Sequence, residues 1–273
     1  MLDFATLAPL VLLLLAIGAF AGVLAGLLGV GGGIVLVPAF YYTFSGMGYE
    51  SGELMQVCLA TSLATIIVTS SRSVMSHNKK GAVDWGILRS WAPGIAIGAV
   101  IGVLVAAGLR SATLQGIFGV LAFFIGLYML FGKISWKLAD EMPGGPLRAV
   151  LSPIVGFLSV LMGIGGGSFG VPIMTLHGVP IHRAVATAAG FGLIIALPSV
   201  IAFLFVDVAH APPYTLGAVN IPTFLIVILT TTLTAPLGVK IAHALDPKPL
   251  KRAFGVFLTL VALNMLRKAF GLF

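Results

Sequence analysis

Charged residues and cysteine are both scarce in this sequence. Asp, Glu, Lys and Arg together make up only 8% of the 273 residues, whereas 59% are hydrophobic and the mean hydropathy is +1.14. A soluble domain of this size would expose far more charge, so we expect an integral membrane protein whose helices are apolar runs of about 20 residues. The single Cys58 excludes an internal disulfide and any cysteine metal site.

Acidic side chains are scarcer than basic ones, and none falls inside an apolar run. All eight stand at the ends of runs or between them: Asp3, Glu50, Glu53, Asp84, Asp140, Glu141, Asp207 and Asp246. Buried charges in membrane proteins usually mark an ion path, so this distribution argues against a sodium or metal-cation transporter. No metal site and no cofactor is predicted. The net charge of +7 does not indicate nucleic-acid binding, because no soluble domain or basic arm could carry it.

A glycine-rich element interrupts the apolar sequence twice. Residues 29–38 read GVGGGIVLVP, and residues 163–172 read GIGGGSFGVP, at a shift of 134 (163 minus 29). Nine residues between positions 22 and 38 are identical at that shift, and five of them are glycines. Three successive glycines cost a helix about 1 kcal/mol each and let the backbone turn sharply, so each copy should break a membrane helix. Isolated glycines such as Gly98 and Gly102 are expected only to allow close helix packing.

The apolar runs form two series that predict an all-helical, polytopic fold of about eight to ten helices. The polar linker 138–146 separates a first repeat, 1–137, from a second, 147–273. The residues Gly81, Ala82 and Val83 recur as Gly217, Ala218 and Val219 at a shift of 136 (217 minus 81). The expected segments are 5–28, 33–46, 54–76, 84–108 and 112–132, then 147–162, 167–178, 182–206, 217–243 and 250–271.

The distribution of Lys and Arg predicts that the two repeats have inverted topology. If each glycine element enters the membrane and returns, with the N-terminus outside, 12 basic residues fall in cytoplasmic loops and 3 outside. If each element crosses once, the better orientation gives only 9 to 6. Segments 33–46 and 167–178 are also too short for a hydrocarbon core of about 30 Å. Each repeat is therefore expected to hold a glycine-broken hairpin and three spanning helices.

The two bends are expected to meet near the middle of the membrane and bind a small anion. Irregular backbone at that depth must be buried in protein or line a watery cavity, and glycine amides and half-helix N-termini there present positive partial charge. Nearby hydroxyls, and one arginine close to a segment end, could also contact the bound anion. The hydroxyls could instead bond their own helices, and the arginine could simply reach the interface. The candidate site residues are Gly31, Gly32, Gly33, Gly165, Gly166, Gly167, Ser168, Thr61, Ser62, Thr187 and Arg72.

The duplicated Gly-x-Gly-Gly-Gly-(x)4-Pro elements are followed by Ala60-Thr61-Ser62, Ala186-Thr187 and Gly81-Ala82-Val83-Asp84. In these motifs the sequence resembles the TauE/SafE sulfite exporter family over essentially its full length. The resemblance implies a permease of the cytoplasmic membrane that moves sulfite, sulfonates or related organosulfur or organic anions. Ala188 and Asn220 stand where the first copy has Ser62 and Asp84, so the two halves of the site are not expected to be identical.

Two other functions remain open beside an alternating-access transporter. One is a channel-like anion pore, which would use the same bends. For a transporter, the sequence leaves open coupling to protons or to the membrane potential, and it leaves the oligomeric state open as well. An intramembrane enzyme is not favoured, because a serine nucleophile such as Ser168 needs a base within hydrogen-bond reach. The histidines all fall at segment ends, where solvated or capping roles are expected: His77, His177, His182, His210 and His243. We therefore predict a transporter that is not an enzyme and whose partners are the lipid bilayer and a small anionic substrate.

Overall fold

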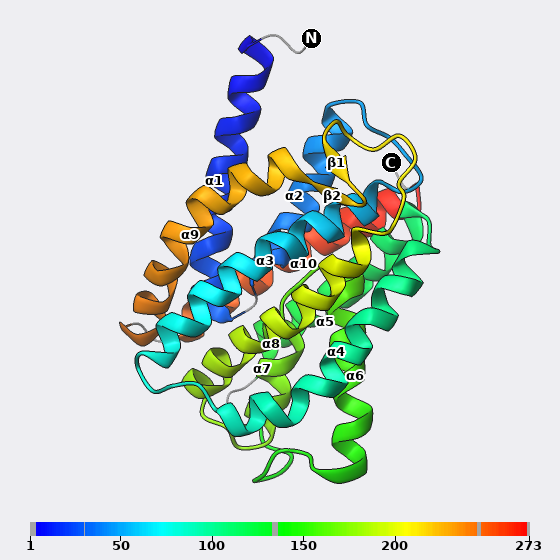
Figure 1. Cartoon of the computed structure of the whole chain (residues 1–273). Coiled ribbons are helices and arrows are strands. Elements are labelled where there is room, and N and C mark those ends of the chain that lie inside the picture. The colour runs from blue at the N-terminus through cyan, green and yellow to red at the C-terminus, as the bar shows by residue number, and fades with distance from the viewer. Residues whose placement is uncertain (1–3, 30, 133–135, 245–246, 272–273) are drawn as a thin grey trace.

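The computed structural model describes residues 4–271 except 30, 133–135 and 245–246. The described chain forms ten helices and one two-stranded hairpin (Figure 1). In chain order they are α1 (Phe4–Leu28), α2 (Gly33–Gly46), α3 (Leu54–Asn78), α4 (Trp85–Ala107), α5 (Ser111–Phe131), α6 (Gly145–Leu161), α7 (Gly167–Leu176), α8 (Ile181–Phe203), β1 (Thr215–Leu216), β2 (Val219–Asn220), α9 (Ile221–Ala244) and α10 (Pro247–Ala269).

The helical, multi-pass architecture predicted from hydropathy is confirmed. Six of the described helices, α1, α3, α4, α5, α8 and α9, contain stretches long and apolar enough to cross a membrane. The start expected for the ninth helix, at Gly217, is wrong by four residues. Gly217 has a φ of +55° and begins the turn between β1 and β2, so α9 starts only at Ile221.

The two glycine elements do break the helices, and the helices that follow them are short. Helix α2 has 14 residues and α7 has 10, lengths of roughly 21 Å and 15 Å at a rise of about 1.5 Å per residue. In Figure 1, α1 runs down to its bend and α2 returns upward, whereas α6 rises to its bend and α7 returns downward. The amide of Leu138, just before α6, donates to the carbonyl oxygen of Leu176 at the end of α7, so both ends of that hairpin lie together.

The long helices pack in pairs that join the two halves of the chain. Helix α1 packs along α9, and α6, in the corresponding place of the second half, packs along α4. Helix α3 crosses α8, and α5 lies against α10. Every one of these pairs takes one helix from α1–α5 and one from α6–α10, so the most extensive helix packing joins the two halves.

Glycines and small residues permit the closest of these approaches. A methyl group added at Gly98 of α4 would collide with the backbone of Pro153 in α6, and one at Gly102 would press on Val160. In the matching pair, Gly18 and Gly22 of α1 face the hydroxyls and backbone of the threonine run in α9. The packing role expected for such isolated glycines is confirmed.

The turns that lead into α4 and α9 repeat one another bond for bond. The amide of Ala82 donates to the carbonyl oxygen of His77 at 3.2 Å, and the amide of Ala218 donates to that of Phe203 at 3.0 Å. Each turn then supplies the cap of the next helix. The side chain of Asp84 accepts from Ile87 in α4, and that of Asn220 accepts from the third residue of α9.

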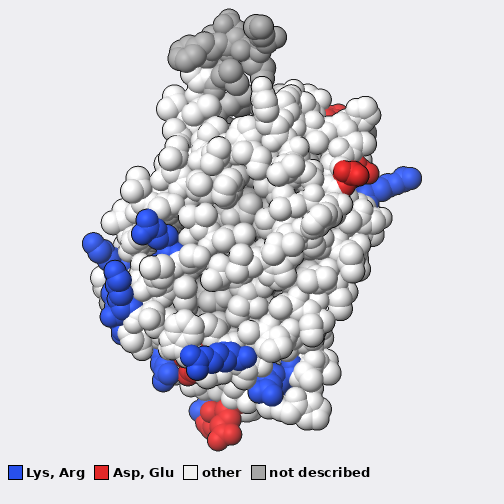
Figure 2. Space-filling view, in the orientation of Figure 1, with Lys and Arg blue, Asp and Glu red and all other residues white. Residues whose placement is uncertain are grey.

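Basic residues are not spread evenly over the surface. On the face shown in Figure 2, Lys and Arg gather at the lower end and lower left edge, near the turns α3–α4 and α7–α8. An ion pair, Arg183 to Asp84 at 2.9 Å, joins these two turns. The opposite end of the molecule, with the α2–α3 turn and β1–β2, shows few basic groups in this view.

Candidate functional site

The two glycine bends lie against each other in the interior. A methyl group placed on Gly33 would collide with the carbonyl oxygen of Gly163, and one on Gly31 would lie 3.3 Å from the Cα of Gly165. All four glycines are buried. The expected meeting of the bends is therefore seen directly, and glycine is required because the facing backbones leave no room for a side chain.

The bends are built differently in the two copies. Gly31 and Gly32 have φ values of +75° and +80°, in the left-handed region that favours glycine. Gly166, which corresponds to Gly32, has a φ of −66° and an ordinary helical conformation. The two copies of the motif thus adopt different turns.

The glycines of both bends are buried, and four of their amides donate to no described residue. Among the described residues, the amides of Gly31, Gly32, Gly165 and Gly166 donate no hydrogen bond, whereas carbonyl oxygens there do accept. A buried donor left without a partner costs about 1–3 kcal/mol, so native proteins rarely keep four together. Backbone N–H groups that converge in a turn beside a helix N-terminus are a typical anion-binding arrangement.

Helix α3 holds the bends in place through its hydroxyls. Ser62 donates to the carbonyl oxygen of Gly163 at 2.7 Å, and Thr69 lies 3.2 Å from that of Gly31. Ser168, the second residue of α7, is 6% exposed, and its hydroxyl has no hydrogen-bond partner among the described residues. The structure therefore brings Ser62 and Gly167, the first residue of α7, to the bends together with the other glycines, and leaves the Ser168 hydroxyl free.

Thr61 and Thr187 perform a different task from the other candidates. The hydroxyl of Thr61 accepts a hydrogen bond from the amide of Asn220 at 2.9 Å, and that of Thr187 accepts one from the amide of Asp84 at the same distance. Each threonine thus fixes the residue that caps a helix of the other half. The two turns lie at opposite ends of the molecule, so the pair does not form one cluster with the glycines (Figure 1).

Arg72 is the last of the candidate residues, and the histidines are expected in solvated or capping positions. The side chain of Arg72 is exposed, although its neighbour Ser73 is buried, so Arg72 does not belong to the buried group at the bends. The expectation that every histidine is solvated or capping is wrong for His77, which is 1% exposed and lies 3.2 Å from the carbonyl oxygen of Gly26 in α1. His177 does cap its own helix, with Nδ1 2.7 Å from the carbonyl oxygen of Ile173.

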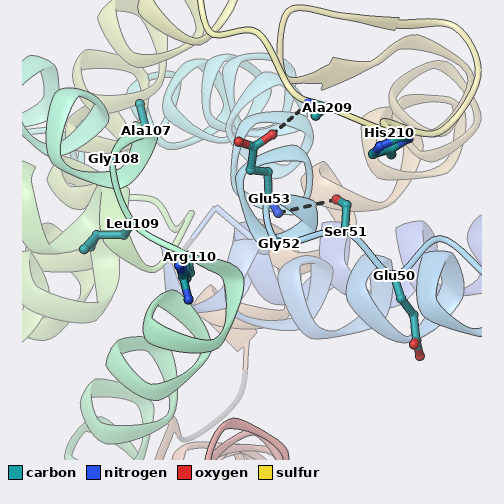
Figure 3. Close-up of a pocket in the computed structure, with 10 residues that line it drawn as sticks. All are labelled: Glu50, Ser51, Gly52, Glu53, Ala107, Gly108, Leu109, Arg110, Ala209 and His210. Atoms are coloured by element: carbon teal, nitrogen blue, oxygen red, sulfur yellow. Dashed lines mark hydrogen bonds between the residues drawn. The ribbon is translucent and has the colours of Figure 1, made fainter.

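A surface pocket that the sequence did not reveal opens at the end away from the basic cluster. Its volume is about 420 Å³, and Figure 3 shows its lining, drawn from the α2–α3, α4–α5 and α8–β1 turns. Glu53 projects into it and accepts a hydrogen bond from the amide of Ala209 at 2.7 Å. Arg110 and His210 bring basic groups to the same lining, which contains none of the predicted site residues. The pocket is thus a mouth of mixed charge, separate from the bends.

The described residues offer little for catalysis or metal binding. They contain no group of three or more His, Cys, Asp or Glu side chains able to hold a metal ion. The hydroxyl of Ser168 has no base bonded to it within that part of the chain, as a serine nucleophile would require. The polar groups present at the bends are backbone amides, carbonyl oxygens and hydroxyls.

Comparisons with known proteins agree over almost the whole length. The family model described as sulfite exporter TauE/SafE matches residues 14–265. A probable membrane transporter protein of Haemophilus influenzae is 33% identical over 261 residues, which cover 94% of this chain and 98% of the relative. One of Methanocaldococcus jannaschii is 29% identical over 271 residues, with 97% of each chain covered. YunE of Bacillus subtilis, also a probable membrane transporter protein, is 30% identical over 196 residues, 64% of this chain and 71% of that one. No solved structure matches the chain.

Proposed function

The chain belongs to the sulfite exporter TauE/SafE family of membrane transporters, and we propose that it moves a small oxyanion through a site between its two glycine bends. Sulfite, a sulfonate or a related organosulfur or organic anion fits this site. One observation carries the proposal: four buried glycine amides at the facing bends have no partner in the described chain, and anion oxygens are the acceptors that such donors suit.

Binding by backbone dipoles suits a carrier better than binding by a full charge. A helix N-terminus contributes a partial charge of about +0.5, which attracts an anion without neutralising it and so allows its release. No Lys or Arg is buried among the described residues. Arg72, although exposed, stays in the proposal as a group that attracts the anion toward the bends from the surface rather than one that holds it.

Inverted repeats explain how the same site can open to either side. Two observations support a two-fold relation between 1–137 and 147–273. The first helix of each half packs on the fourth helix of the other half, as α1 does on α9 and α6 does on α4, and the turns before α4 and α9 match. The two hairpins enter from opposite ends in Figure 1. In this mechanism one repeat rocks against the other about the bends, as in other transporters with broken helices at matching positions.

The orientation follows from the basic residues. The positive-inside rule assigns the end that carries the α3–α4 and α7–α8 turns, with the linker 138–146, to the cytoplasm. The pocket around Glu53 and Arg110 would then face the outside. A cytoplasmic-membrane location agrees with this assignment, since it leaves only 3 of the 15 Lys and Arg residues outside.

Binding and counterflow measurements test the proposal. Full-length protein in detergent is titrated with sulfite, thiosulfate, alkanesulfonates and carboxylates, and thermal shifts are recorded; a ligand at about 100 times its Kd should stabilise the fold by about 2.7 kcal/mol. In proteoliposomes, unlabelled anion inside should accelerate uptake of the labelled one, which a channel-like pore would not do. Absence of binding by every anion of the panel would refute the proposal.

A further inference from the structure

Besides Ser168, a second buried hydroxyl beside the bends has no hydrogen-bond partner in the described chain. Ser70 of α3 is 1% exposed, and its Oγ bonds to nothing in the described chain. Serines within helices can donate to the carbonyl oxygen one turn earlier. Ser71 does so to Ile67 at 2.6 Å, and Ser199 does so to Ile195 at 2.7 Å. Ser70 has given up that bond and keeps its donor free inside the protein.

The free hydroxyl faces the second bend. A methyl group placed on Gly192 of α8 would collide with the Oγ of Ser70 and would lie 3.6 Å from the Cα of Gly165. The hydroxyl, the bare backbone at Gly192 and the glycine bend therefore converge on one spot. The amides of Gly165 and Gly166 and the hydroxyl of Ser168, all unpartnered in the described chain, belong to the same bend and the start of α7.

Near Gly31 the first bend faces a hydrocarbon side chain, and the hydroxyl of Thr69 there is already bonded. Both Cγ atoms of Ile66, one turn before Ser70, would lie 3.2 Å from a methyl group on Gly31, and Ile66 is completely buried. At the shift of 126 that relates Thr61 to Thr187 (187 minus 61), Ile66 corresponds to Gly192. At the shift of 134, Ile34 corresponds to Ser168. At these two pairs of matched positions the first copy carries isoleucine, whereas the second carries glycine or serine, and the unpartnered hydroxyls of Ser70 and Ser168 belong to the second bend.

From this asymmetry we infer that the site orients its substrate, with Ser70 as a binding residue and Ile66 as an apolar wall. The inference rests on the function proposed above and narrows the class of substrate. An oxyanion with one apolar substituent, such as a short alkanesulfonate, fits better than an inorganic oxyanion. In the described state a methyl group at Gly33 or Gly192 would already collide with its neighbours, so the substrate enters when rocking of the repeats moves the bends apart. Its oxygens then accept from the Ser70 hydroxyl and the amides of the second bend, and its alkyl group packs on Ile66.

The test compares two buried serines by titration calorimetry on the full-length protein. Ser70→Ala removes the free donor, and Ser199→Ala is the matched control because its hydroxyl already bonds its own helix. We expect Ser70→Ala to weaken ethanesulfonate binding about ten-fold or more, since a hydrogen bond to a charged group is lost. Ser199→Ala should stay within two-fold of wild type. For wild type, affinity should rise about four-fold per carbon from sulfite to methanesulfonate to ethanesulfonate.

A second pair of variants keeps the inference testable if Ser70→Ala does not fold. Ser70→Cys retains the shape with a weaker donor and should also weaken binding. Ile66→Ala enlarges the apolar side and should move the preferred substrate toward longer alkyl chains. The inference is overturned if the Ser70 variants bind ethanesulfonate like wild type, or if sulfite binds more tightly than the alkanesulfonates. In either case anion binding by wild type would leave the proposed function standing, whereas no binding of any anion would remove both.

Discussion

A single methyl group at Gly33 should disable the transporter, and this prediction can be worked out from the contacts of the residue. Gly33 is the first residue of α2, and its φ is not in the left-handed region, so alanine can adopt its backbone conformation. The added Cβ would nevertheless collide with the carbonyl oxygen of Gly163 and come within 2.9 Å of both Ile164 and Ile66. Two of these neighbours are backbone atoms of the opposite bend, which cannot rotate away.

The expected size follows from two opposed effects. Alanine is favoured over glycine in a helix by up to about 1 kcal/mol. Overpacking against a well-packed interior costs about 1–3 kcal/mol, and here the bends can relieve it only by moving apart. We expect Gly33→Ala to be destabilised by about 1–2 kcal/mol overall and to lose at least ten-fold in transport rate, because the facing amides would no longer converge on one anion.

Gly46 provides the control within the same helix. It is the last residue of α2, and a methyl group there would have nothing within 4 Å. Gly46→Ala should unfold at or slightly above the temperature of wild type and transport normally. Melting in detergent and counterflow in proteoliposomes measure the two properties on both variants. Normal transport by Gly33→Ala would show that the contact between the bends is not needed, and the reasoning would be refuted.

Three further predictions concern the cap of α4, the topology and the exposed arginine. Asp84→Ala should cost about 1 kcal/mol through the lost cap to Ile87, whereas Asp84→Asn, which installs the residue found in the matching turn, should cost less; thermal unfolding of both variants would decide. A cysteine at Lys79 in a Cys58→Ser background should react with an impermeant thiol reagent only after the cells are opened, and labelling of intact cells would contradict the inverted topology. Arg72→Gln should slow uptake modestly and leave the equilibrium dissociation constant of the anion within about two-fold of wild type, because the side chain of Arg72 is exposed. Complete loss of anion binding would instead show that the Arg72 side-chain charge recognises the substrate.

Hydropathy and glycine spacing were sufficient to predict the helices. Nine of the ten described helices start within three residues of the expected position. Local signals such as the glycine runs and the capping residues set these starts. The exception is α9, which starts after the short β1–β2 hairpin. Two residues per strand carry no alternating pattern, so periodicity could not have revealed it. The family could also be predicted from the sequence, since the duplicated motif occurs in both halves.

The roles of individual polar groups were decided only by the tertiary structure. Thr61 and Ser62 are neighbours in one triplet, yet one fixes the turn before α9 and the other bonds the glycine bend. Ser70 was one of many hydroxyls in an apolar run, and nothing local set it apart. Whether a buried hydroxyl bonds its own helix or stays free depends on which helix crosses at that point, and here the crossing brings Gly192 opposite Ser70. Local sequence determines where a helix begins and ends, whereas contacts between residues more than 100 positions apart determine which of its side chains remain available to a substrate.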